Sequence, residues 1–353
     1  MESRVRNAIA RLPDVDAFVV SSASNRFYLS GFRGSAGTLF ITPGAAYYIT
    51  DGRYAEAVGK AVKGMEVVNG IQPAHHEVAA LCGVHGVKRL GIEDRDMTVA
   101  VYNIFKEAMP DVELVPVRDA IVGLRAVKDA QEIEKLQNAQ AVADRAFLEV
   151  LDFIAAGRTE KECAKVLEDA LYRFGAEGLA FPTIAVGGTN SSQPHGKPSA
   201  YVLQQGDFLT MDFGVVLEGY VSDMTRTVAI GRPSDEMRTV YDTVLRAQLA
   251  AIDAASPGVV CSDVDKAARD IIEEAGYGEH FVHNLGHSFG IDIHESPRFS
   301  STCTDLLEPG MCITVEPGVY LPGRFGVRIE DTVVVTQGGV RNFTTGPKHL
   351  IEL

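Results

Sequence analysis

The sequence contains few cysteines, and none of them is arranged as a pair that could carry chemistry. The 353-residue chain has five, which are scattered along it: Cys82, Cys163, Cys261, Cys303 and Cys312. No Cys-x-x-Cys spacing occurs, so neither a cysteine zinc site nor a redox dithiol is indicated. Scattered thiols in a chain of this size are typical of a reduced cytoplasmic protein, and we expect a cytoplasmic location.

Long apolar runs and clusters of basic residues are also missing. The net charge of −14 and the pI near 5.1 would repel nucleic-acid phosphates and anionic lipid heads, and no basic run offsets them. No segment has the apolar length of a membrane span. Arg4, Arg6 and Arg11 interrupt the apolar residues of the first 14 positions, unlike a signal peptide. We therefore expect neither nucleic acid nor a membrane as a partner.

The length of the chain and its apolar fraction of 46% suffice for two domains with separate cores. In the first part, short β-rich runs alternate with helical patterns, which predicts an α/β layer with a partly parallel sheet. Strands are predicted at 17–21, 38–42, 47–50, 89–92 and 113–117, and helices at 52–62, 76–82 and 98–108. A long helix is predicted from Lys128, because apolar residues recur there at spacings of three and four. We place the boundary near Gly123, which gives domains 1–122 and 123–353.

The second domain is predicted to contain two β-hairpins among helices. Further helices are predicted at 160–174, 234–254 and 261–275, and a strand with a glycine-rich loop at 183–192. The hairpins carry a faint repeat: residues 206–214 match residues 310–318 in glycine, threonine, acid and glycine, at one offset of 104 residues. Downstream, Asp223 is echoed by Glu330. Two similar halves that face each other would bring four carboxylates together.

The turn signals predict how these acids pair. A hairpin centred between residues 217 and 218 would place Asp212 directly opposite Asp223, at about 4.5–5.5 Å between Cβ atoms. Glu316 and Glu330 are placed symmetrically about residue 323. One acid in a strand usually faces solvent. Four acids in two matched apolar hairpins instead predict a bound cation, because close carboxylates repel each other.

Histidines supply a second ligand type. His283, His287 and His294 lie close together in the sequence beside glycines, and His195 is a weaker loop candidate. Carboxylates with one imidazole and no thiolate suit Mn²⁺, Co²⁺, Zn²⁺ or Fe²⁺. Two ions about 3.5–4 Å apart, bridged by carboxylates and a hydroxide, would balance the charge and supply a strong nucleophile. Amides are favoured over phosphate esters as substrates, because the surroundings are acidic.

These motifs together resemble a known family. They are Met-Asp-Phe-Gly at 211–214, Tyr-Val-Ser-Asp-Met-Thr-Arg-Thr at 220–227, Gly-His-Ser-Phe-Gly at 286–290, Thr-Val-Glu-Pro-Gly at 314–318 and Gly-Val-Arg-Ile-Glu-Asp-Thr at 326–332. In this order they resemble the pita-bread metallopeptidases of the Xaa-Pro aminopeptidase and Xaa-Pro dipeptidase (prolidase) branch. Residues 25–32 and 51–54 resemble the creatinase-type amino-terminal domain. The implied fold is α+β: a pita-bread catalytic domain with pseudo-twofold β-hairpins, preceded by a smaller α/β domain.

The resemblance also implies a role for each matched residue. Two divalent metal ions are expected, Mn²⁺ first and Co²⁺ or Zn²⁺ as alternatives. The implied ligands are Asp212 on one ion, His287 and Glu316 on the other, and Asp223 and Glu330 bridging both. Glu316 would also shuttle a proton, and Arg328 would support the metal site. The implied substrate-pocket histidines, which would steady the scissile carbonyl, are His195, His283 and His294.

The implied function is hydrolysis of the Xaa-Pro bond, at the amino terminus of peptides or in Xaa-Pro dipeptides, by a metal-bridging hydroxide. Short proline-containing peptides would be the substrates, and a homodimer is expected from the family. Arg298 could bind the free carboxylate of a dipeptide, although a solvated loop arginine is an equal alternative. The alternative functions are a non-catalytic pita-bread binding protein and an aminopeptidase of other amino-terminal specificity.

Overall fold

One mixed sheet forms from the β-rich segments at the start of the chain. The computed structural model describes residues 2–117 and 120–353. Its first unit, residues 1–125, contains a six-stranded sheet in the order β4-β3-β2-β1-β5-β6. The elements of this unit are α1 (Glu2–Arg11), β1 (Ala17–Val20), α2 (Ala23–Ser30), β2 (Thr38–Ile41), β3 (Ala46–Thr50), α3 (Ala55–Ala61), β4 (Glu66–Asn69), α4 (His75–His85), β5 (Arg89–Ile92), α5 (Val99–Ala108), β6 (Glu113–Pro116) and α6 (Val122–Ala126).

The prediction of a partly parallel sheet is confirmed. Strand β1 is parallel to β5, β5 to β6 and β3 to β4, whereas β2 is antiparallel to both of its neighbours. All five predicted strands and the three predicted helices of this part are present. The sequence analysis missed β4, because its four residues are only half-buried or exposed and so lack an apolar pattern.

The second unit, residues 126–353, consists of two similar halves. Its elements are α7 (Ala130–Val150), α8 (Glu160–Arg173), β7 (Gly178–Leu179), β8 (Ile184–Gly187), η1 (Gly188–Ser192), β9 (Phe208–Phe213), β10 (Val215–Leu217), β11 (Tyr220–Val221), β12 (Met224–Ala229), α9 (Asp235–Ala254), α10 (Cys261–Glu274), η2 (Gly278–His280), β13 (Gly286–Ser288), β14 (Glu295–Phe299), β15 (Cys312–Val315), β16 (Gly318–Leu321), β17 (Phe325–Arg328), β18 (Asp331–Thr336) and β19 (Gly339–Asn342). The four long helices predicted for this part are all present.

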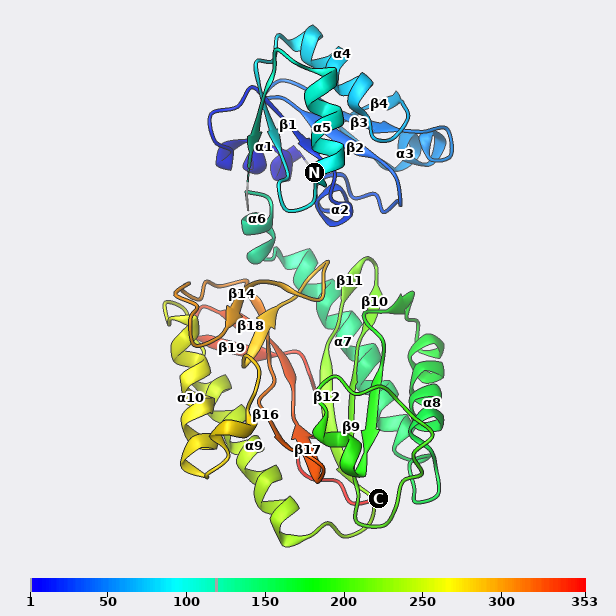
Figure 1. Cartoon of the computed structure of the whole chain (residues 1–353), viewed down its shortest axis with the longest axis vertical. Coiled ribbons are helices and arrows are strands. Elements are labelled where there is room, and N and C mark those ends of the chain that lie inside the picture. Colours follow the sequence, from blue (N-terminus) through cyan, green and yellow to red (C-terminus); the bar gives the residue numbers. More distant parts are fainter. Residues whose placement is uncertain (1, 118–119) are drawn as a thin grey trace. The chain divides into compact units, whose positions relative to one another are not determined.

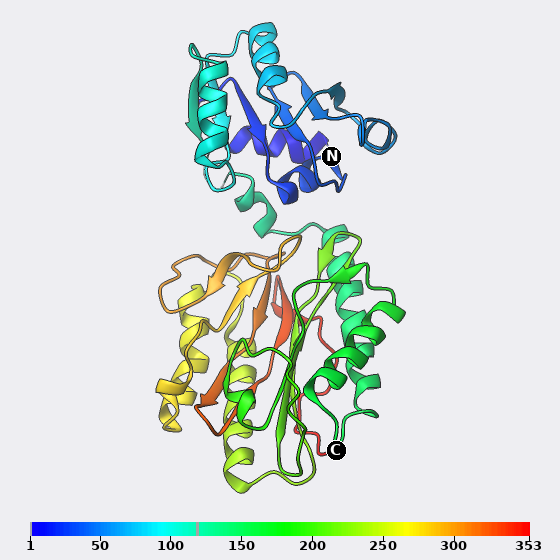
Figure 2. The same cartoon turned by 45° about the vertical axis from the view of Figure 1, so that its right-hand side comes forward.

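Each half has its own pair of helices and its own core. Helices α7 and α8 pack against β8, β9 and β12, and helices α9 and α10 pack against β14, β15, β16, β17 and β18. Figures 1 and 2 show the two helix pairs on opposite sides of the strands. The strands of the two halves therefore meet in the middle of this unit. No helix within residues 2–117 and 120–353 is both long and apolar enough to cross a membrane.

The register of the first hairpin differs from the prediction. Asp212 is opposite Thr225 and not opposite Asp223. The turn residues are Glu218 and Gly219, both with positive φ (49° and 79°), as in a two-residue hairpin turn. This turn is centred one position later than predicted, so the pairing moves by two residues. A shift of two keeps a side chain on the same face of the sheet, so Asp223 is diagonal to Asp212 on that face.

The register of the second hairpin is as predicted. Gly318 pairs with Arg328, Leu321 with Phe325 and Val315 with Asp331, so residue 323 is the midpoint throughout. The ladder is interrupted between β15 and β16 and between β17 and β18. Glu316 and Glu330 both lie at this interruption and remain opposite each other.

The return strands of the two hairpins are joined directly. The Thr225 hydroxyl donates to Glu330 Oε2 at 2.8 Å. The buried Arg226 guanidinium donates to the Asp331 carboxylate at 2.8 Å and to the Glu330 carbonyl oxygen. Burial of Asp331 would raise its pKa, but the charges of Arg226 and Lys348 outweigh burial and lower it. Asp331 is therefore a stable anion that holds the start of β18 against β12.

Gly286 is required by a close backbone approach between β13 and β15. A Cβ at this position would lie 2.0 Å from the backbone oxygen of Thr314. We expect Gly286→Ala to destabilise the second unit by about 1–3 kcal/mol or more, because β13 must move away from β15. Calorimetric unfolding measures this effect. The matched control is Gly83→Ala in α4, where a Cβ meets nothing within 4 Å; this change should be neutral or slightly stabilising. Equal effects of the two substitutions would contradict the steric explanation.

Candidate metal centre and active site

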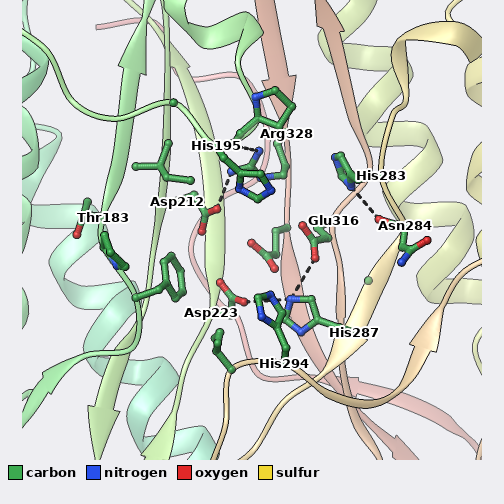
Figure 3. Close-up of a pocket in the computed structure, with 18 of the residues that line it drawn as sticks. Thr183, His195, Asp212, Asp223, His283, Asn284, His287, His294, Glu316 and Arg328 are labelled. Carbon is green, nitrogen blue, oxygen red and sulfur yellow. Dashed lines mark hydrogen bonds and ion pairs between the residues drawn. The ribbon is translucent and has the colours of Figure 1, made fainter.

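One cavity of about 580 Å³ in the second unit collects every residue that the sequence singled out for function. Figure 3 shows acids, histidines and Arg328 that reach it from both halves. The predicted residues that line it are His195, Asp212, Asp223, His283, His287, His294, Arg298, Glu316, Arg328 and Glu330. The sequence placed them on separate strands and loops, and the structure brings them to one place.

The four acids that line the cavity lie at or near the ends of β-strands. Asp212 is near the end of β9, and Asp223 immediately precedes β12. Glu316 and Glu330 lie between strands, and their backbone N–H groups donate across to Leu285 O (2.8 Å) and Thr225 O (3.1 Å). These hydrogen bonds hold the backbone of each acid although its own ladder is interrupted.

The innermost cluster is formed by Asp223, His287 and Glu330, whose possible ligand atoms all lie within 4.8 Å of one another. His287 Nε2 is 3.6 Å from Asp223 Oδ2 and 3.3 Å from Glu316 Oε1. Its other ring nitrogen, Nδ1, lies 3.2 Å from the Ser288 carbonyl oxygen, which can only accept. Nδ1 therefore carries the proton in a neutral ring, and the bare Nε2 faces carboxylate oxygens.

Burial and crowding change the proton affinities of this cluster. Burial, followed by repulsion from neighbouring carboxylates, raises the pKa of Asp223 and of Glu330 well above the usual range. Burial also raises the pKa of Glu316 to about 8. Burial, with His294 nearby, lowers the pKa of His287 to about 3. In the absence of a cation, the cluster thus favours neutral carboxyls and a neutral imidazole.

Two buried oxygens in this cluster accept no hydrogen bond from any residue that the structure describes. They are Asp212 Oδ1 and Glu330 Oε1. An unsatisfied buried acceptor is costly, whereas a divalent cation would satisfy both oxygens and the bare Nε2 of His287. Carboxylate oxygens with one imidazole form a donor set that divalent transition metals accept. The residues present therefore fit bound divalent cations.

Arg328 holds the outer acid in place. Its Nη2 donates to Asp212 Oδ2 at 2.6 Å and its Nε to the Thr225 hydroxyl at 3.0 Å. Thr225 in turn donates to Glu330 Oε2, so one chain of hydrogen bonds orients two of the acids. Arg328 is buried, and its position beside the acids is the one expected from the sequence.

Tyr320 is a part of the site that the sequence analysis missed. Its hydroxyl accepts from Arg328 Nη1 at 2.8 Å and lies 2.9 Å from His283 Nε2. His283 Nδ1 faces the Asn284 carbonyl oxygen at 2.8 Å. Nδ1 must donate to that carbonyl, so the Tyr320 hydroxyl donates to Nε2. Both ring nitrogens of His283 are therefore engaged within the protein, and burial lowers its pKa to about 4.

One sequence signal could have found Tyr320. It lies four residues after Glu316, and a Cβ on Gly318 would be 2.5 Å from the Tyr320 hydroxyl. A glycine between a functional acid and a tyrosine on alternate strand positions indicates that the tyrosine folds over it.

The remaining pocket residues are more exposed. The ring of His294 is edge-on to that of His287, with 4.5 Å between centroids. Arg298 is directly opposite His287 in the β13–β14 ladder. His195 is exposed in the loop that follows η1. His195, His294 and Arg298 are thus the predicted residues best placed to meet a bound molecule.

A buried carboxylate holds the loop that carries His195. Glu160, at the start of α8, is fully buried and accepts four hydrogen bonds. Gly187 N (2.7 Å) and Asn190 Nδ2 (3.0 Å) donate to Oε1, and Ser199 donates to Oε2 through both N (2.8 Å) and Oγ (2.6 Å). Glu160 therefore binds residues on both sides of His195 and holds the two ends of this loop in place.

Known proteins share these features. The description "Metallopeptidase family M24" matches residues 134–337, and the description "Creatinase/Prolidase N-terminal domain" matches residues 3–127. A curated relative, the uncharacterized peptidase YqhT of Bacillus subtilis, is 40% identical over 350 residues, which cover 99% of each chain.

Two solved structures are similar over nearly the whole chain. The Xaa-Pro dipeptidase from Bacillus anthracis has a TM-score of 0.97 and 38% identity, and covers 100% of this chain and 99% of its own. The X-Pro aminopeptidase from Thermotoga maritima has a TM-score of 0.91 and 36% identity, with 98% and 99% covered. One of these structures is of a dipeptidase, and the other is of an aminopeptidase.

The charge balance of the cluster predicts opposite effects of Glu330→Gln with and without metal. In metal-free protein at pH 8 the variant should melt at a higher temperature than the parent, because folding raises the pKa of Glu330 and so costs stability at a pH where the unfolded chain ionises this group freely. Added Mn²⁺ should stabilise the parent, by about 2.7 kcal/mol at a hundred times its Kd, and the variant much less. Thermal melts with and without chelator measure both effects.

The matched control for this prediction is Glu279→Gln, which changes an exposed acid outside the cavity. It should melt like the parent under both conditions. A metal-free Glu330→Gln protein that melts below the parent would contradict the repulsion.

Proposed function

The chain belongs to metallopeptidase family M24, with a creatinase-type amino-terminal domain and a pita-bread catalytic domain, and we propose that it hydrolyses the Xaa-Pro bond of short peptides. The strongest support is the donor set: four acids and the His287 imidazole meet in one cavity, and two of the buried oxygens have no partner among the described residues. Such a set suits metal-assisted hydrolysis of an amide.

Five residues are the proposed metal ligands. Asp212 would hold one divalent cation, His287 and Glu316 the other, and Asp223 and Glu330 would contact both. When bound, the pair of ions would polarise the scissile carbonyl and lower the pKa of a water molecule. The complete donor set favours a catalyst over a non-catalytic binding protein on the same fold.

Glu316 is the proposed proton carrier. Its Oε1 accepts from the Thr314 hydroxyl at 3.1 Å, which fixes one edge of the carboxylate, and the side chain lines the cavity. From there it would take a proton from the attacking water and give it to the leaving nitrogen. Proline supplies a tertiary amide, so its nitrogen has no hydrogen until this proton arrives.

The histidines are proposed to stabilise the charge that develops on the carbonyl oxygen. His195 and His294 are exposed to the cavity and would donate to that oxygen. His283 would act through its neighbours, because its two nitrogens are already engaged by Asn284 and Tyr320. It steadies the Tyr320 hydroxyl, which in turn receives a hydrogen bond from Arg328.

The cavity wall suits a proline ring. Phe181, Pro182, Ile184 and Ile293 contribute apolar surface to a cavity whose other side is charged. A pyrrolidine ring would be buried against this wall without leaving a polar group unpaired. Short proline-containing peptides are therefore the proposed substrates. Mn²⁺ as the native metal, a homodimer and a cytoplasmic location remain predictions.

Asp223→Ala tests the proposed role of the carboxylate between the two ions. Cleavage of a Xaa-Pro dipeptide and of a Xaa-Pro tripeptide should fall to the background rate, and the far-ultraviolet circular dichroism should be retained. The matched control, Asp242→Ala in α9, changes an exposed aspartate outside the cavity and should retain full activity. Full activity of Asp223→Ala would refute the role, as would undiminished activity after exhaustive removal of metal.

Arg298 is the proposed anchor for the free carboxylate of a dipeptide. A charge-assisted hydrogen bond contributes about 1.5–3 kcal/mol, so Arg298→Met should raise the KM for a Xaa-Pro dipeptide by about 10- to 100-fold. The KM for the same dipeptide with an amidated carboxyl terminus should not change. Steady-state kinetics on the two substrates measure the difference. An unchanged KM for the dipeptide would identify Arg298 as an ordinary solvated residue, and equal increases in KM on both substrates would contradict the role as an anchor.

A further inference from the structure

A buried ion pair lies behind the cavity and takes no part in the proposed chemistry. Lys128 Nζ is 3.2 Å from Glu295 Oε2, and only 2% of the lysine side chain and 4% of the glutamate side chain are exposed. Lys128 Nζ also donates to the Ala126 carbonyl oxygen at 3.3 Å. A buried pair of this kind is seldom a net source of stability, because removing two charges from water offsets their attraction. A positional role is the alternative explanation.

Glu295 closes the turn that carries His294. Its Oε1 accepts from the backbone N–H groups of Ile291 (3.0 Å) and Asp292 (3.1 Å). The approach is close, since a Cβ on Gly290 would lie 3.0 Å from both carboxylate oxygens and from Lys128 Cε. The Glu295 carboxylate thus binds two backbone N–H groups of the turn. His294 is the residue immediately before Glu295.

Lys128 connects this turn to the rest of the second unit. It directly precedes Asp129, which caps α7, and its backbone N–H donates to Gly310 O at 2.9 Å. The same turn is tied to the first hairpin, because Val221 N donates to Gly290 O at 2.9 Å, two residues before Asp223. The pair therefore lies where α7, the His294 turn and the first hairpin meet.

We infer that Lys128 and Glu295 are positioning residues that fix His294 beside His287 in the geometry that hydrolysis needs. The inference rests on the proposed peptidase function and deepens it, since it adds two residues that act on the reaction through His294. Neither Lys128 nor Glu295 lines the cavity. The effect of the pair is confined to where the imidazole of His294 is held.

The decisive variant is Lys128→Met/Glu295→Gln, which removes both charges and keeps an acceptor for the N–H groups of the turn. The melting temperature of this double variant should equal that of the parent, because no unpaired charge is left buried. The kcat for a Xaa-Pro dipeptide should still fall by about ten- to a hundredfold, with KM unchanged. Recovery of both melting temperature and kcat would show that the pair is only structural.

Coupling to His294 separates positioning from general damage. In a His294→Ala background, adding Glu295→Gln should lower kcat no further, because the residue being positioned is already gone. In a His195→Ala background the same substitution should lower kcat by its full factor. If Glu295→Gln lowers kcat by the same factor in both backgrounds, the inference is wrong.

A matched control separates positioning from loss of stability. Leu167→Ala removes a fully buried side chain of α8 that does not line the cavity. It should lower the melting temperature while kcat stays near that of the parent. The melting temperature and kcat are then compared for Leu167→Ala, Lys128→Met and Glu295→Gln. If the loss of kcat is proportional to the loss of melting temperature in all three variants, the inference is wrong.

A readout that needs no catalysis keeps this inference distinct from the proposed function. Diethyl pyrocarbonate modifies exposed neutral histidines, and peptide mass spectrometry reports the rate at His294. In Lys128→Met/Glu295→Gln this rate should rise severalfold, while the rate at His195 stays constant. A parent protein that cleaves no Xaa-Pro peptide would refute the proposed function alone, and an unchanged rate at His294 would refute the positioning pair.

Discussion

The crowding of carboxylates around one imidazole is the constraint on which the catalytic unit depends. Asp223, Glu316 and Glu330 approach His287 from different strands, and burial with mutual repulsion raises the pKa of each acid. Such an arrangement is unfavourable unless cations or protons neutralise it. A single hairpin could not hold these charges together, because each would turn toward solvent. Two hairpins with a core on each outer side leave the acids no other direction.

The two halves resist this repulsion because their return strands are joined by a hydrogen bond and an ion pair. The Thr225–Glu330 hydrogen bond and the Arg226–Asp331 ion pair both connect the start of β12 with the start of β18. Arg328 adds a third connection by holding Asp212 from the second hairpin. Positive charge is thus placed beside the acids, and Asp212 Oδ1 and Glu330 Oε1 remain without a hydrogen-bond donor among the described residues. These two oxygens are suited to a cation.

Buried carboxylates fall into two groups in this unit, and the difference assigns their roles. Glu160 and Glu295 are saturated with hydrogen-bond donors, mostly backbone N–H groups of loops, and each holds a loop that presents a histidine. Asp212 and Glu330 each keep one oxygen without a donor. The saturated carboxylates act as structural anchors, and the unsaturated ones face the place where a cation would bind. A count of donors therefore distinguishes the two roles where residue type alone cannot.

The sequence by itself determined seven helices, five strands of the first sheet, the residues that meet in the cavity and one of the two registers. The midpoint at residue 323 was predictable because that turn is symmetric, whereas short elements such as α1, α2, α6, β4 and β7 were not located. Only the tertiary structure decided the rest. The cross-strand pairing of Asp212 depended on the backbone angles at Glu218 and Gly219, which the residue types alone do not specify. Tyr320 was missed because its partners are His283, in the loop before β13, and Arg328, at the end of β17. Local patterns report what a segment can form, whereas the contacts that orient a side chain are made by residues far away in the sequence.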